Sequence, residues 1–150
     1  MSEEIEKQEE QEEQGITHTY ADPVPDYILQ DFVSWANLGL RISLTISIKG
    51  NIYSGMLISG AQWCEKNIDD IENTNASDEL KNTIKAYYNN LKEERYSSPE
   101  KANSGNIGFL HIDNVRIISG NRPSEFETRW RFKIGEIDGF SLGKIEPSQQ

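Results

Sequence analysis

Two histidines and one cysteine are the side chains best suited to catalysis in this 150-residue sequence. His18 lies in an acidic N-terminal segment, and His111 lies between Leu110 and Ile112 in an apolar run. A hydrolytic triad needs a nucleophile, a histidine base and an orienting carboxylate, and the order of residues suggests no such set around either histidine. Cys64 and two distant histidines also lack the spacing of a zinc site. The sequence therefore predicts no catalytic residue, no metal site and no cofactor.

Asp69, Asp70 and Glu72 form the densest acidic cluster outside the N-terminal segment. Neighbouring residues on a helix point in different directions, so we expect a solvated helix face here and not a catalytic pair of carboxylates. Two glycine-containing segments, residues 50–55 and 139–143, lack the Lys-Ser/Thr ending of a phosphate-binding loop. Neither leads into a predicted helix, so hairpin and bulge roles are expected for them.

A basic stripe is the one constellation that indicates binding. It consists of alternate residues of a predicted strand, namely Arg129, Arg131 and Lys133. Trp130, Phe132 and Ile134 lie between and after them. Because successive side chains of a strand point to opposite faces, we expect the aromatic residues to face the core and the basic stripe to face water. The stripe either serves only as a wet face or binds an acidic partner, such as the Glu-rich segment of another copy.

The formal net charge of −10 is unevenly distributed along the chain. The first fourteen residues contain seven glutamates and only one lysine. The glutamates are Glu3, Glu4, Glu6, Glu9, Glu10, Glu12 and Glu13. Such a block cannot bury enough apolar surface to become ordered, so residues 1–22 are expected to form a disordered acidic tail. Residues 23–150 are long enough for a single domain with its own core.

The composition also narrows the class of protein. Without the tail the chain is only mildly acidic, and it lacks the clustered lysines and arginines that phosphate contact needs, so nucleic-acid binding is not favoured. A single cysteine cannot form an internal disulfide, and an acidic N-terminus is unlike a secretory signal. No apolar run reaches the length of a membrane span. A cytoplasmic protein without a membrane partner is the simplest expectation.

Three helices are predicted from periodicity. Apolar residues recur at three- and four-residue spacing over residues 26–38, which follow Pro25 and end before Gly39. Two further helices are predicted over residues 61–72 and 77–96. The second is mostly charged, so we expect it to be a lid on the sheet or an exposed excursion.

A hairpin is predicted between the first helix and the second. Residues 40–49 alternate apolar and polar side chains, as in a strand with one buried face. Gly50-Asn51 predicts a two-residue turn into a return strand over residues 52–59. That turn would place Ile46 opposite Gly55, where the missing side chain leaves room for a sharp bend or a closely packed helix.

The remaining strands are predicted late in the chain. Residues 107–119 form a strand whose apolar parity breaks near Asp113-Asn114, which indicates a bulge. Residues 128–135 and 137–145 complete the sheet. The predicted class is α+β, with an antiparallel sheet of about five strands, an N-terminal helix and a helical insertion. A small Sm-like barrel has the same order of elements and stays open as an alternative.

Four segments together resemble the gas vesicle accessory protein U family. Two are Ile-Ser-Leu-Thr-Ile-Ser-Ile-Lys-Gly at residues 42–50 and Ile-Tyr-Ser-Gly-Met-Leu-Ile-Ser-Gly at residues 52–60. The others are Phe-Leu-His-Ile-Asp-Asn-Val-Arg-Ile at residues 109–117 and Trp-Arg-Phe-Lys-Ile-Gly-Glu-Ile-Asp-Gly-Phe-Ser-Leu-Gly at residues 130–143. The resemblance covers most of residues 26–145. It rests on the ordered set, because no single segment is diagnostic.

The resemblance implies a small, non-catalytic, cytoplasmic bacterial protein linked to gas vesicles. It implies a role in vesicle assembly or clustering, through contacts with the shell, with other accessory proteins or with itself. Two other classes stay open: an Sm-like nucleic-acid-binding or general interaction module, and an enzyme of unknown type. A ligand-sized polar pocket around His111 would favour the enzyme.

Overall fold

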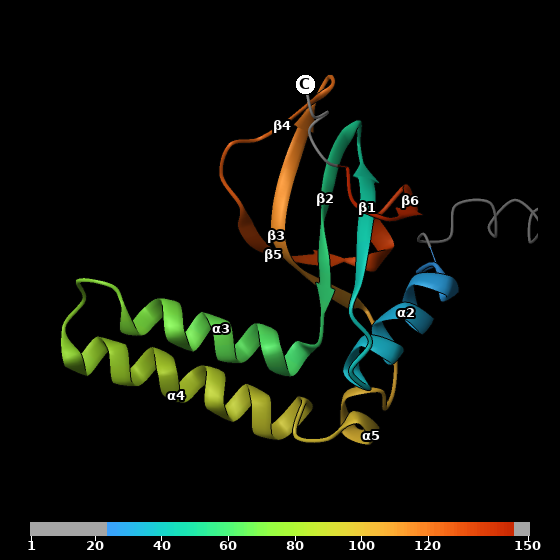
Figure 1. Cartoon of the computed structure of the whole chain (residues 1–150). Helices are drawn as coiled ribbons and strands as arrows, with labels where there is room; N and C mark the ends of the chain where they lie inside the picture. The colour runs from blue at the N-terminus through green and yellow to red at the C-terminus, as the bar shows by residue number, and fades with distance from the viewer. Residues whose placement is uncertain (1–23, 146–150) are drawn as a thin grey trace, which may run out of the picture.

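The computed structural model describes residues 24–145, so the acidic tail predicted at residues 1–22 lies outside the described residues. The fold is α+β and is built on an antiparallel sheet, as predicted (Figure 1). The first helix within the described residues is α2 (Tyr27–Asn37), where the carboxylate of the N-cap residue Asp26 accepts a hydrogen bond from the backbone N–H of Ile28 at 2.9 Å. The residues that α2 buries in the core are Leu29, Val33 and Ala36.

The first hairpin joins β1 (Ile42–Ile48) to β2 (Asn51–Ile58). Its turn residues are Lys49 and Gly50, with φ of 48° and 84°, as a type I′ turn requires. The prediction of a Gly50-Asn51 turn is therefore wrong by one residue, and Leu44 instead of Ile46 lies opposite Gly55. A long-range contact supports the observed turn, because the backbone N–H of Lys49 donates to the Asp138 carboxylate at 2.6 Å.

The predicted bulge is confirmed in β3 (Phe109–Ser119). Pairing with β2 shifts between Ser54 and Met56, and Asn114 has a φ of 51°. Gly55 makes this approach possible, because a Cβ there would lie 2.5 Å from the carbonyl oxygen of Asp113. The space that was predicted beside Gly55 is thus filled by the backbone of the bulged strand β3.

The last strands pair with two different strands of the sheet. The short β4 (Arg122–Pro123) and β5 (Thr128–Lys133) both pair with β3, whereas β6 (Gly139–Leu142) pairs with β1. A 3-10 turn, η2 (Ile134–Glu136), carries the chain from β5 towards β6. The six strands therefore follow the order β4-β3-β2-β1-β6 with β5 beside β3. No ladder joins β5 to β6 within residues 24–145, so the sheet stays open and the barrel alternative is not realised.

A helical insertion separates β2 from β3. It consists of α3 (Gly60–Glu72), α4 (Asp78–Arg95) and the single turn α5 (Pro99–Ala102). Ser59 and Gln62 form a capping box that begins α3 directly after β2. Figure 1 shows α3 and α4 lying antiparallel and extending well beyond the sheet. None of the described helices has both the length and the apolar character needed to cross a membrane.

Candidate functional site beneath the helical insertion

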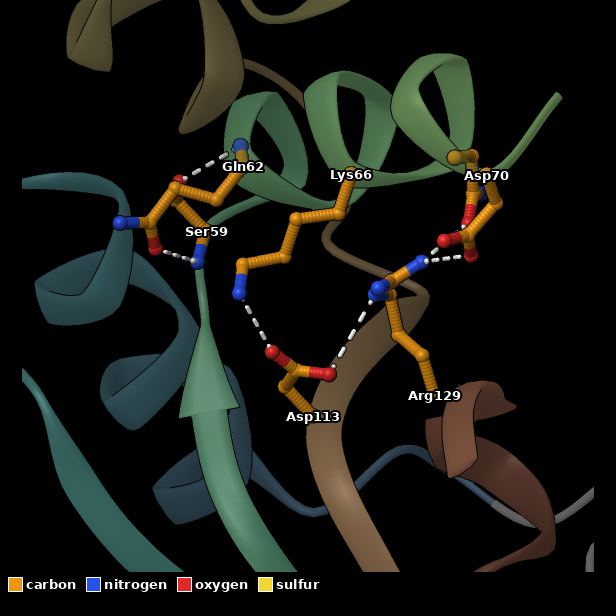
Figure 2. Close-up of polar contacts among 7 residues, drawn as sticks. Ser59, Gln62, Lys66, Asp70, Asp113 and Arg129 are labelled. Carbon is orange, nitrogen blue, oxygen red and sulfur yellow. Dashed lines mark hydrogen bonds and ion pairs between the residues drawn. The ribbon is translucent and has the colours of Figure 1, made fainter. Parts of the chain in front are cut away.

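Arg129 lies under α3 and not in open water. Its Nη1 donates to Asp70 at 2.8 Å and to Asn67 at 2.9 Å, both on α3 (Figure 2). Its Nε forms an ion pair of 3.3 Å with Asp113 on β3, and its side chain is only 16% exposed. The expectation that the whole basic stripe faces water is therefore wrong for Arg129, because α3 packs over this part of β5.

Asp113, at the bulge of β3, forms ion pairs with two basic side chains. One carboxylate oxygen accepts from Lys66 of α3 at 2.7 Å, and the other faces Arg129 (Figure 2). Burial alone would raise the pKa of Asp113. The Lys66 hydrogen bond, the backbone N–H of Asn114 and the charges of Lys66 and Arg129 outweigh burial and lower this pKa. Asp113 therefore stays ionised and links α3 to the sheet.

These four side chains form a neutral cluster that we call the charge cluster: Lys66, Asp70, Asp113 and Arg129. Its two positive and two negative charges balance inside the chain. Because α3, β3 and β5 each contribute to it, the charge cluster links the insertion to the sheet.

Arg131, the second residue of the basic stripe, lies among aromatic rings. Its guanidinium carbon lies 3.9 Å from the centre of the Phe109 ring and 5.3 Å from that of Trp63. Its Nη1 is 3.0 Å from Nε2 of His111 and donates to the Tyr96 hydroxyl at 3.4 Å. Uncharged groups thus hold its guanidinium in place. Within residues 24–145 no carboxylate neutralises its charge.

His111 is a buried, neutral ring. It is 2% exposed, and it stacks on Trp63 with ring centres 4.6 Å apart. Burial, and secondarily the charge of Arg131, lower the pKa of His111 to about 3. Since a guanidinium can only donate, Nε2 must be the acceptor and the proton belongs on Nδ1. A ring with its accepting nitrogen occupied and so low a pKa is a poor general base at neutral pH.

A pocket of about 410 Å³ opens beside these rings, at the junction of α2, the insertion and β3. Charged side chains from three elements line it: Glu94 and Arg95 of α4, Lys101 of α5 and Arg131 of β5. His111 and Tyr96 line it as well. The polar pocket considered around His111 is thus present, with an excess of positive charge and without a free base. Within residues 24–145, no three His, Cys, Asp or Glu side chains gather closely enough to hold a metal ion.

Lys133, the third residue of the basic stripe, lies at a neighbouring hollow with Pro25, Gly108 and Phe109. Its side chain is exposed and has no hydrogen-bond or ion-pair partner among residues 24–145. The structure thus divides the basic stripe, with Arg129 in the charge cluster and with Arg131 and Lys133 at adjacent hollows.

Sequence reasoning did not select Arg95 and Lys101 as site residues. Each lies in the last turn of its helix, where a basic residue is common because it complements the helix dipole. Only the fold of the insertion brings them to Arg131. Their chain spacing of 36 and 30 residues from Arg131 (131 − 95 and 131 − 101) carried no signal.

Comparison with known proteins gives one result that decides the family. Residues 26–145 match the family described as Gas vesicle protein GvpU-like. The chain belongs to this family. Searches of curated proteins and of solved structures found no match.

The GvpU-like match spans every described helix and strand, from α2 to β6. The helical insertion, the charge cluster and the pocket beside Arg131 all lie inside the matched range. The resemblance inferred from the four sequence segments is confirmed, and the chain is a gas vesicle-associated protein by family.

Proposed function

We propose that this GvpU-like chain is a non-catalytic accessory protein that acts in gas vesicle assembly or clustering through protein-protein contacts. The match of residues 26–145 to a gas vesicle family carries the proposal. Its partners would be the vesicle shell or other accessory proteins, and a second copy of the chain could provide a further contact. Its location would be the cytoplasm, at the vesicle surface.

The helical insertion supports a contact role. α4 buries none of its residues, and Leu80 and Tyr87 on it are exposed. Apolar side chains on a helix that adds little to the core are available to a partner. Arg131, at the pocket beside the end of α4, and Lys133, at the adjacent hollow, add a second, positively charged surface. We assign Arg129 a supporting part, because the charge cluster holds α3 in place.

The geometry around His111 favours binding over catalysis. A catalytic base must be able to take up a proton near neutral pH. The pKa of His111 is lowered to about 3, and its accepting nitrogen faces Arg131. The pocket therefore offers positive charge and hydrogen-bond donors to a ligand, and these are features of recognition.

The proposal is tested by expressing a gas vesicle gene set with and without this chain and imaging the cells by electron cryomicroscopy. We expect the chain to change the number or the spacing of vesicles. The variant Leu80→Gln/Tyr87→Gln should reduce the change, whereas Phe126→Gln, at an exposed aromatic residue outside the insertion, should not. Vesicles of unchanged number and arrangement with and without the chain would contradict the proposal.

A further inference from the structure

The pocket beside Arg131 has an unbalanced positive charge in a protein of net charge −10. Three cations line it, Arg95, Lys101 and Arg131, against one carboxylate, that of Glu94. Within residues 24–145 none of the three cations forms an ion pair. Lys66 of α3 and Arg129 beneath it are by contrast paired in the charge cluster. The pocket is therefore a place beneath the insertion where positive side chains outnumber negative ones.

Arg131 is prepared to bind such a ligand. The Phe109 ring lies against its guanidinium at 3.9 Å, and both groups that accept from its Nη1, His111 and Tyr96, are uncharged. No described group accepts from its Nε or Nη2, so these donors remain for a carboxylate. A guanidinium held in one orientation binds a carboxylate through two parallel hydrogen bonds, at a lower cost in side-chain entropy.

The chain itself enters the described fold beside this pocket. Asn106, Gly108 and Phe109 line both the pocket and the neighbouring hollow of about 340 Å³. That hollow also contains Pro25, Lys133 and Glu136. The eleven residue-to-residue steps from Glu13 to Val24 (24 − 13) can span up to about 36 Å when extended. The glutamates of residues 3–13 are thus within reach of Arg95, Lys101 and Arg131.

We propose that this pocket is a carboxylate-binding site that takes the Glu-rich segment at residues 3–13 of the same chain. The segment brings seven glutamates and one lysine, and Lys133, which shares the neighbouring hollow with Glu136, is a fourth cation along its path. Tethering raises the local concentration of the segment to about millimolar, so even weak contacts are occupied. The inference goes beyond the proposed function, because it holds whether or not the chain binds vesicles. For a vesicle partner with an acidic segment, it means that the partner must displace residues 3–13.

A spin label on the full-length chain tests the proposal. Cys64 is fully buried, so a nitroxide reagent applied to the Gln8→Cys variant labels residue 8 selectively. With the chain enriched in ¹⁵N, we expect the label to weaken the amide signals of Arg95, Lys101, Phe109 and Arg131. The signal of Arg122, on β4 opposite Ser119 at the far end of β3, should be unaffected. At about 1 M salt, where the Debye length falls to about 3 Å, the weakening should be lost.

Matched variants decide the outcome. Arg95→Gln/Lys101→Gln should abolish the weakening while leaving Arg131 and the ring stack in place, and Arg122→Gln should preserve it. Replacing the glutamates of residues 3–13 with glutamine should also abolish it. Mixing labelled ¹⁴N chain with unlabelled ¹⁵N chain should give no weakening. Signals that are unaffected, that are weakened as much in Arg95→Gln/Lys101→Gln as in the wild type, or that are weakened to a similar extent in the mixed sample would overturn the proposal.

Discussion

Replacing Asp113 with asparagine tests the charge cluster. The substitution keeps the size of the side chain but removes the one carboxylate that faces both Lys66 and Arg129. Breaking a buried ion pair costs about 3–5 kcal/mol. The Lys66 side chain is 42% exposed, so water can solvate its charge once Asp113 is replaced. The loss of this pair should therefore cost only about 0–1 kcal/mol, as for a surface ion pair. Arg129 is the buried partner, and Asp70 still faces it after the substitution.

We therefore expect Asp113→Asn to lower the free energy of unfolding by about 2–3 kcal/mol at pH 7. For a chain of this length that corresponds to a fall in Tm of about 4–12 °C. Urea denaturation followed by tryptophan fluorescence measures the difference. In double-mutant cycles, the coupling of Asp113 with Arg129→Gln should exceed its coupling with Lys66→Gln, because Arg129 is the more buried of the two cations.

The loss of stability in Asp113→Asn should depend on pH in a definite direction. The pKa of Asp113 is lower in the folded chain than its ordinary value of 3.8. Its contribution is therefore fully present above pH 3.8 and is lost as the pH falls through the folded pKa. The gap in stability between the wild type and Asp113→Asn should narrow below pH 3.8. A variant as stable as the wild type at pH 7, or a gap independent of pH in this range, would refute the reasoning.

Three further predictions concern the bulge, the buried ring and the competing class. Gly55→Ala should lower the free energy of unfolding, measured by urea denaturation, by about 1–3 kcal/mol, because the added Cβ would meet the backbone of β3. Gly139→Ala, where the added Cβ has open space around it, should lower it far less. The His111 ring should show no titration by NMR between pH 8 and about pH 4.5, because its pKa is lowered to about 3; stability should instead fall as the pH drops below 6.5, the ordinary pKa that His111 regains on unfolding. An inflection of the folded signal near pH 6.5 would contradict this burial. In RNA filter binding at about 0.15 M salt the chain should not retain RNA, and retention that falls steeply with salt would favour the nucleic-acid alternative.

Local patterns predicted most elements of the fold. The alternation in β1, the apolar spacing in α2 and the broken parity at Asp113-Asn114 are properties of short segments, and each led to the observed element. The hairpin register did not follow in the same way. Gly50 can occupy either central position of a two-residue turn, and the bond from Lys49 to Asp138, 89 residues away, accompanies the observed choice.

The candidate site was harder to predict because it depends on how the insertion packs. Alternation correctly placed Phe132 and Ile134 in the core, but it was wrong for Trp130, which is 39% exposed. It could not show that α3 covers Arg129, or that α4 and α5 bring Arg95 and Lys101 to Arg131. Charged side chains on separate elements meet only when tertiary structure forms, so a stripe on one strand was a poor guide to which charges stay unbalanced.

Binding to gas vesicles is the central claim, and co-flotation measures it most directly. Purified intact vesicles are mixed with increasing amounts of the full-length chain and centrifuged so that the vesicles rise. We predict that the chain rises with them in a saturable manner and moves to the pellet when the vesicles are first collapsed by pressure. A chain that stays below the vesicles at every concentration, both as the wild type and with the glutamates of residues 3–13 replaced by glutamine, would contradict the account.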